Sequence, residues 1–290
     1  MPKPRVEWST IALLFAVYAA FCLLTAFHEA LPPWALALLG GLPLALHGSL
    51  QHEAIHGHPT GSARLNALLV GPALSLWLPF GSYRRSHLAH HAAPLTDPHE
   101  DPESFYRDAA TYASWSWARR ALAWIDMTLI GRLTLGPFVV VARSTKGELA
   151  RLARRERRTV KAWLAHVPAV AVVLLWLAWC ELSFPKYVLC FVLPGLSLTL
   201  LRSFAEHHAS GEHTAVVETN PLLSLLFLNN NLHTIHHAQP NLAWYAIPAR
   251  YRRAPIDPEV RYYRGYLDVL RRYAFTPIAP PWHPKSPRRA

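Results

Sequence analysis

Two apolar stretches near the start of the chain decide its fold: Thr10–Phe27, TIALLFAVYAAFCLLTAF, and Trp34–Leu50, WALALLGGLPLALHGSL. Two further runs of the same character occupy Trp163–Cys180 and Tyr187–Leu201. A helix needs roughly 17–25 apolar residues to cross a hydrocarbon core about 30 Å thick, and each run approaches that length. With 52% hydrophobic and 16% charged residues among 290, the chain is predicted to be an all-α integral membrane protein with four transmembrane helices.

Short turns at 28–33 and 181–186 join the four runs into two pairs, which predicts two helical hairpins. Across both turns, Lys186 is the one Lys or Arg residue, and nearly all other basic residues lie in the N-terminal tail, in 51–162 or after 201. By the positive-inside tendency, both termini and the histidine-rich segments are expected in the cytoplasm. The net charge of +11 then indicates a basic surface that faces anionic lipid headgroups, and no basic soluble domain suggests nucleic acid.

The remaining segments give a simple domain organisation. Leu65–Phe80 is short for a span and contains Gly and Pro, so it is expected to be re-entrant or interfacial, and Trp115–Val141 has the mixed Trp and Arg content of an amphipathic layer at the headgroups. Arg143–Lys161 is basic, which favours a helix on the membrane surface, with a docking patch for an acidic electron donor as the alternative. We expect one membrane domain over 1–276 and an unstructured Pro/Arg-rich tail over 277–290.

Histidine is the residue type that carries the chemistry. The chain has 17 histidines, and three clusters stand out: His52–His56 (HEAIH), His87–His91 (HLAHH) and His233–His237 (HTIHH). On a helix, spacings of three and four residues return to one face, so each cluster aims its imidazoles in one direction. Neutral imidazole binds iron, zinc or copper, and eight imidazoles exceed the needs of one tetrahedral ion. The clusters therefore predict two metal ions.

Nine histidines are the candidate metal ligands, the ninth being the one that follows the fourth apolar run: His52, His56, His87, His90, His91, His207, His233, His236 and His237. The carboxylates beside them are candidates to hold the imidazole N–H groups: Glu53, Glu206, Asp97 and Asp101. His208 and His58 are further candidates for such an outer role, and His213 is expected at the surface. Isolated histidines are assigned structural or surface roles: His28, His47, His99, His166 and His283.

The first cluster also matches His-Glu-x-x-His, the zinc-protease motif, so a membrane zinc protease is a rival hypothesis. That hypothesis explains two ligands and leaves the other two clusters without a role, and no Asp in the chain is followed by Gly to supply the partner motif of membrane proteases. A carboxylate-rich di-iron site needs two Glu-x-x-His motifs, and Glu53–His56 is the single match. A metal transporter would need ligands inside the spans.

The three clusters, their order, the two hairpins and the closing stretch Asn231–Tyr245 (NLHTIHHAQPNLAWY) resemble the membrane fatty acid desaturase superfamily over about residues 34–250. The resemblance implies that the box histidines bind two irons at the cytoplasmic mouth of a helical bundle. It also implies that a histidine after the fourth span, here His207, completes the set. The first box has three residues between its histidines, which departs from the acyl-CoA Δ9 type and leaves the substrate open.

The resemblance and the site together predict O₂-dependent desaturation of a fatty acyl or similar chain. An unactivated C–H bond offers no acidic proton, so acid/base catalysis by side chains cannot start this reaction, and two iron ions with O₂ as co-substrate supply the oxidising power. The alternatives are a hydroxylase or ketolase of a lipid, carotenoid or small amphiphile, and more distantly the zinc protease. Electrons are expected from a separate carrier such as a ferredoxin with its NAD(P)H reductase, and the location is expected to be a bacterial inner membrane.

Overall fold

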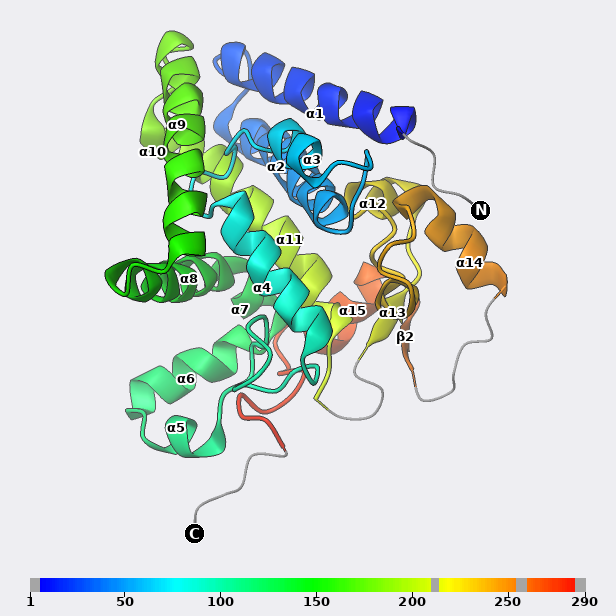
Figure 1. The fold of residues 1–290 in the computed structure, drawn as a ribbon. Helices are drawn as coiled ribbons and strands as arrows, with labels where there is room; N and C mark the ends of the chain where they lie inside the picture. The colour runs from blue at the N-terminus through cyan, green and yellow to red at the C-terminus, as the bar shows by residue number, and fades with distance from the viewer. Residues whose placement is uncertain (1–5, 210–213, 254–259, 285–290) are drawn as a thin grey trace. The chain divides into compact units, whose positions relative to one another are not determined.

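The computed structural model describes residues 6–209, 214–253 and 260–284, and it is mostly helical (Figure 1). The packing of the chain divides it into two compact units, and the prediction of one membrane domain over 1–276 stays a prediction. The first unit comprises residues 1–85 and 138–199, and the second comprises 86–137 and 200–290.

The first unit holds the long apolar helices. Its elements are α1 (Trp8–Ala26), α2 (Pro33–Ile55), α3 (Ala63–Leu69), α9 (Arg157–Trp179), α10 (Phe184–Tyr187) and the π-helical turn η1 (Val188–Val192), together with the first part of α4 (Phe80–Ala92), most of α8 (Gly136–Ala153) and the first part of α11 (Leu193–Glu206). The basic stretch 143–161 is not the one helix that was expected. It divides at Arg155, which has a positive φ of 55°, between α8 and α9.

Four helical segments are long and apolar enough to cross a bilayer: Trp8–Ala26, Pro33–Ile55, Arg157–Trp179 and Phe184–Glu206. They correspond to the four predicted runs, so the prediction of four membrane-spanning helices is confirmed at the level of length and composition. Each of the last three is longer than its apolar run, because the helix continues into polar residues that the hydropathy pattern leaves out. Their pairing in hairpins and their orientation in the membrane stay predictions.

The end of α3 and the irregular segment between α3 and α4 have carbonyl groups that need partners inside an apolar unit. Side chains from the long helices provide them. Tyr18 donates to the carbonyl of Leu69 at 2.7 Å, and His166 lies 3.0 Å from the carbonyl of Leu76. Gln51 donates to the carbonyl of Val70 at 3.2 Å. The polar residues in these spans therefore serve backbone groups, which is the structural role predicted for His166.

Small residues let α2 approach η1 and α11 closely. A Cβ atom on Gly41 would lie 2.7 Å from Pro194 Cβ, and one on Gly195 would lie 2.7 Å from Leu44 Cβ. Both distances are shorter than two carbon atoms tolerate, so these positions admit only hydrogen. Such contacts between backbones are a common way for membrane helices to associate, because lipid offers them no hydrophobic driving force.

The second unit is built from short elements. They are α5 (Ala109–Ala113), α6 (Trp117–Asp126), α7 (Leu129–Thr134), α12 (Pro221–Leu226), α13 (His233–Ala238), η2 (Trp244–Ala246), α14 (Ile247–Arg253) and α15 (Tyr266–Tyr273), with the ends of α4 and α11. The all-α prediction missed a pair of strands, β1 (Ala215–Val217) and β2 (Arg261–Tyr263), which run parallel with Val216 opposite Tyr262. Strands of three residues are too short for a readable alternation of polar and apolar residues.

The tail was predicted to be unstructured from residue 277, and this is corrected for residues 277–284. Ile278 donates its N–H to the carbonyl of Met127 at 2.9 Å, and His283 is buried. The Pro-rich composition misled the prediction, because proline also suits an ordered extended segment whose few N–H groups are paired. Residues 285–290 lie outside the described part of the chain.

Replacement of Gly41 by Ala should destabilise the protein, because the new methyl group would overlap Pro194. Overpacking costs about 1–3 kcal/mol, which outweighs the gain of about 1 kcal/mol that Ala brings to a helix. Gly48 of the same helix is the matched control, since its nearest neighbour would lie 3.9 Å from the added Cβ. The midpoint temperature of thermal unfolding in detergent should therefore fall for Gly41→Ala and stay the same or rise for Gly48→Ala. Equal behaviour of the two variants would contradict the close packing.

Candidate metal centre

The second histidine box lies on α4, in the part of that helix that belongs to the second unit. His87, His90 and His91 share one helical face because they are three and four residues apart. The ring centroids of His87 and His91 lie 4.7 Å apart, and those of His90 and His91 lie 5.6 Å apart. His87 and His90 are buried. The box thus gathers three imidazoles on one face of the helix, two of them buried.

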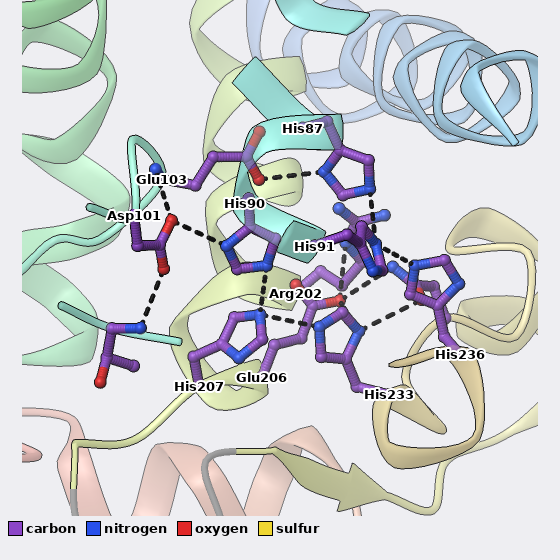
Figure 2. A network of polar contacts seen from close by, with 12 residues as sticks. His87, His90, His91, Asp101, Glu103, Arg202, Glu206, His207, His233 and His236 are labelled. Atoms are coloured by element: carbon purple, nitrogen blue, oxygen red, sulfur yellow. Dashed lines mark hydrogen bonds and ion pairs between the residues drawn. The ribbon is translucent and has the colours of Figure 1, made fainter. Parts of the chain in front are cut away.

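Two carboxylates from one short loop hold the Nδ1 atoms of this box (Figure 2). His87 Nδ1 lies 3.0 Å from Glu103, and His90 Nδ1 lies 2.8 Å from Asp101. Asp101 also accepts the backbone N–H groups of Thr96 and Glu103. Burial raises the pKa of Glu103, but the neighbouring His87 outweighs it and the pKa falls to about 2. Glu103 is therefore an ionised acceptor, and the hydrogen of each ring sits on Nδ1.

The third box is held by a different set of polar groups. His233 begins α13, and its Nδ1 lies 3.2 Å from Asn230 Oδ1 and 3.4 Å from Glu206 Oε1. Asn230 also donates to Glu206 at 3.2 Å, and Arg202 forms an ion pair with the same carboxyl at 3.0 Å. Because the Asn230 carbonyl oxygen can only accept, His233 Nδ1 must donate. The Nε2 atom of His233 is then left with its lone pair.

His207 follows α11 directly and lies between the two boxes of this unit. Its Nε2 is 3.1 Å from His90 Nε2 and 2.9 Å from His233 Nε2 (Figure 2). In the neutral ring, His207 Nε2 carries one hydrogen at most, so it can donate to only one of them. At least one contact would then have no hydrogen between its two nitrogens. Two imidazoles at right angles on one ion, each roughly 2.1 Å from it, are about 3 Å apart, so a metal ion fits these distances.

A second convergence is centred on His91, whose Nε2 lies 3.1 Å from His87 Nε2 and 3.0 Å from His236 Nε2. The ligand nitrogens of these three residues all lie within 4.8 Å of one another, as do those of His90, His207 and His237. Among the described residues, the buried Nε2 of His237 has no hydrogen-bond partner. The second unit therefore presents two groups of converging imidazoles with surplus lone pairs, which is the donor set that a transition metal requires.

The electrostatics of these rings favours the neutral form that binds metal. Burial lowers the pKa of His91 to about 4, and it lowers the pKa of His233 and His237 well below the usual histidine value. His90 differs. Burial lowers its pKa, but the hydrogen bond to Asp101 and the nearby carboxylates raise it further, with a net increase. Three of the four rings therefore stay unprotonated near neutral pH.

The first box belongs to the first unit. His52 and His56 lie at the end of α2, one turn apart, with ring centroids separated by 5.0 Å. Both are buried. Glu53 Oε1 lies 3.9 Å from His52 Nδ1, and the orienting role predicted for Glu53 stays a prediction.

The other predicted outer residues divide into two groups. Asp101 and Glu206 contact candidate ligands, as described above, whereas Asp97 accepts the backbone N–H groups of His99 and Glu100. His208 contacts Arg261 and Tyr263. His58 pairs with Glu7 at 2.5 Å within the first unit. His213 lies outside the described residues.

Two contributors were missed by the sequence prediction. Glu103 lies two residues beyond Asp101, in the sequence Asp101-Pro102-Glu103. Two acidic residues in a proline-containing loop soon after a histidine box were a signal that could have indicated Glu103. Asn230 stands three residues before His233, at the spacing of an acceptor that faces a ring one turn away. An asparagine in this position has no distinctive pattern, and only the fold reveals it.

Comparison with known proteins agrees with these observations. The family model described as fatty acid desaturase matches residues 29–268, which cover all three histidine boxes and His207. No curated protein matches the chain. The match includes the range of about 34–250 over which the sequence resembles that family, and it confirms the resemblance. The chain belongs to the fatty acid desaturase family.

Proposed function

We propose that this membrane protein is an O₂-dependent di-iron oxidoreductase that introduces a double bond into a fatty acyl or similar aliphatic chain. One observation carries the proposal: the histidines of the second unit converge through their Nε2 atoms while the Nδ1 atoms of three of them are held by Asp101, Glu103 and Asn230. Family membership supports the reaction class, which is oxidoreduction of the desaturase and hydroxylase type.

Nine histidines would hold the two irons: His52, His56, His87, His90, His91, His207, His233, His236 and His237. The support for His52 and His56 is their spacing and their place in the family pattern, and the support for the other seven is their convergence. When bound, two irons would activate O₂, which supplies the oxidising power that an unactivated C–H bond demands. The zinc-protease alternative gains no support, because it leaves these seven imidazoles unexplained.

The chain's own residues would contribute orientation and charge. Asp101 and Glu103 keep the Nδ1 hydrogens of His90 and His87 in place, so the opposite nitrogens stay available as ligands. Glu206 and Asn230 do the same for His233. Electrons would arrive from a separate carrier such as a ferredoxin with its NAD(P)H reductase. We further propose that the centre and both termini face the cytoplasm. The segments that contain them carry nearly all of the basic residues, and basic segments tend to stay on the cytoplasmic side of a membrane.

Comparison of lipids and small metabolites from cells with and without the gene tests the reaction. Mass spectrometry should reveal a product that differs from its precursor by the loss of two hydrogens. A product that has gained one oxygen instead would identify a hydroxylase on the same centre. Cells that carry His90→Ala should match cells without the gene, whereas cells that carry His99→Ala should resemble the wild type, because the His99 side chain is 69% exposed.

Metal content is the direct test of the centre. We expect about two irons per chain in protein purified in detergent, because nine imidazoles exceed the needs of one ion. His90→Ala and His207→Ala should each lower bound iron strongly, since each removes one of the converging nitrogens, and should leave membrane insertion unchanged. Zinc at full occupancy, with activity that needs no O₂, would contradict the proposal.

Removal of the orienting carboxylates should have a smaller effect than removal of a ligand. Asp101→Asn and Glu103→Gln should each reduce iron affinity or activity roughly 10–100-fold, the usual range for groups that orient a metal-binding imidazole. Asp97→Asn is the matched control, because the Asp97 side chain accepts hydrogen bonds from the backbone N–H groups of His99 and Glu100 in the same loop, and an amide oxygen can still accept from them. Similar losses for all three variants would indicate a general effect on the loop.

A further inference from the structure

The loop that carries Asp101 contains a residue in an unusual backbone conformation. Thr96 has a φ of 70°, in the left-handed region that β-branched residues rarely adopt. Thr96 is also 1% exposed, so solvent does not stabilise the conformation. A strained residue of this kind persists only where its surroundings fix it, and such residues gather at functional sites.

Every polar group of Thr96 is occupied. Its N–H donates to Asp101 Oδ2 at 2.9 Å, and its carbonyl accepts from Ser104 Oγ at 2.6 Å. Its hydroxyl forms a hydrogen bond of 3.2 Å with His283 Nε2. The hydrogen bond from the Thr96 N–H connects this loop to the candidate metal centre, because the other oxygen of Asp101 lies 2.8 Å from His90 Nδ1. A chain of contacts therefore runs from His283 to His90.

His283 belongs to a segment that is fastened to the second unit at several points. Ile278 donates to the carbonyl of Met127 at 2.9 Å, Arg107 donates to the carbonyl of Pro281 at 2.9 Å, and His283 donates its own N–H to the carbonyl of Arg107 at 2.8 Å. The neighbouring Trp282 packs against aromatic rings of α5 and α6, with centroids 5.1 Å from Tyr112 and 5.7 Å from Trp124. The segment 278–284 thus presents the His283 side chain at a fixed place.

We propose that residues 278–284 form a strap and that His283 is a positioning residue of the metal centre, a role that rests on the proposed function. The hydrogen bond from His283 keeps Thr96 in the left-handed conformation, and that conformation aims the Thr96 N–H at Asp101. Without it, the backbone of Thr96 relaxes toward an ordinary φ and its N–H turns away. Asp101 then loses one of its three partners, and His90 loses the fixed orientation of its Nδ1 hydrogen.

The test compares iron(II) affinity among purified full-length variants, by titration of metal-free protein in detergent against a competing chelator. His283→Ala should weaken binding about 10-fold, in the range of other groups that orient a ligand from outside. His283→Gln should recover most of the affinity, because its amide can still pair with the Thr96 hydroxyl. A chain that ends at Pro284 is the control for truncation and should bind like the wild type, whereas a chain that ends at Thr276 should bind no better than His283→Ala.

A double-mutant cycle separates positioning from general destabilisation. In the Asp101→Asn background, His283→Ala should produce little further loss, because both changes interrupt one route to His90. Additive losses would overturn the proposal, as would wild-type affinity in His283→Ala or failure of His283→Gln to restore it.

Hydrogen exchange gives a readout that does not depend on metal. In the metal-free protein, peptides that span residues 94–104 should exchange faster in His283→Ala than in the wild type or in the chain that ends at Pro284. Unchanged exchange would overturn the strap. If His283→Ala exchanges faster but the wild-type protein binds no iron, the strap is supported and the di-iron function is rejected. Failure of the strap and failure of the proposed function are therefore distinguishable.

Discussion

A metal-binding imidazole must present a bare nitrogen, and the hydrogen bond at the opposite nitrogen decides whether it does. The second unit is organised around this constraint. Asp101, Glu103 and Asn230 each take the Nδ1 hydrogen of one ring, so the Nε2 atoms face one another at about 3 Å. The acceptors are fixed in turn. Asp101 receives two backbone N–H groups, and the Glu206 carboxyl beside Asn230 pairs with Arg202. Buried charges require such partners, because an unpaired one is costly.

The same residue type has a second use in the first unit, and the partner of each ring distinguishes the two uses. His166 lies 3.0 Å from the carbonyl of Leu76, and His28 lies 3.2 Å from the carbonyl of Cys180. These rings pair with backbone oxygens outside or at the end of a regular helix, where a carbonyl group needs a partner. Three candidate ligands, His87, His90 and His233, instead have an acceptor at Nδ1 and another imidazole at Nε2. The environment of a histidine therefore identifies its role more surely than its presence in a cluster.

Much of the fold and the candidate ligands could be predicted because both depend on local periodicity. An apolar run of span length and a His-x-x-His-His spacing are visible in a few consecutive residues. The groups that complete the centre depend on tertiary structure. Glu103 reaches His87 through a loop, and Asn230 reaches His233 across the start of a helix. His283 stands 187 residues away from Thr96 in the chain. A contact between residues so far apart in the chain leaves no spacing to read, and so the sequence prediction placed His283 among the isolated histidines and assigned the tail no structure.

The distribution of charge suggests why the acids of this centre stand behind the histidines and not among the ligands. A neutral imidazole leaves the full positive charge on a bound ion, whereas a carboxylate ligand would cancel part of it. In the second unit, Asp101 and Glu103 would act on the proposed ions through the rings that they hold, and the Glu206 carboxyl pairs with Arg202. In the proposed di-iron centre, negative charge would thus lie close enough to compensate two buried cations without occupying coordination positions. In the proposed reaction, coordination positions left open in this way would be available to O₂, so the contacts that fix each tautomer would also keep a bound metal accessible.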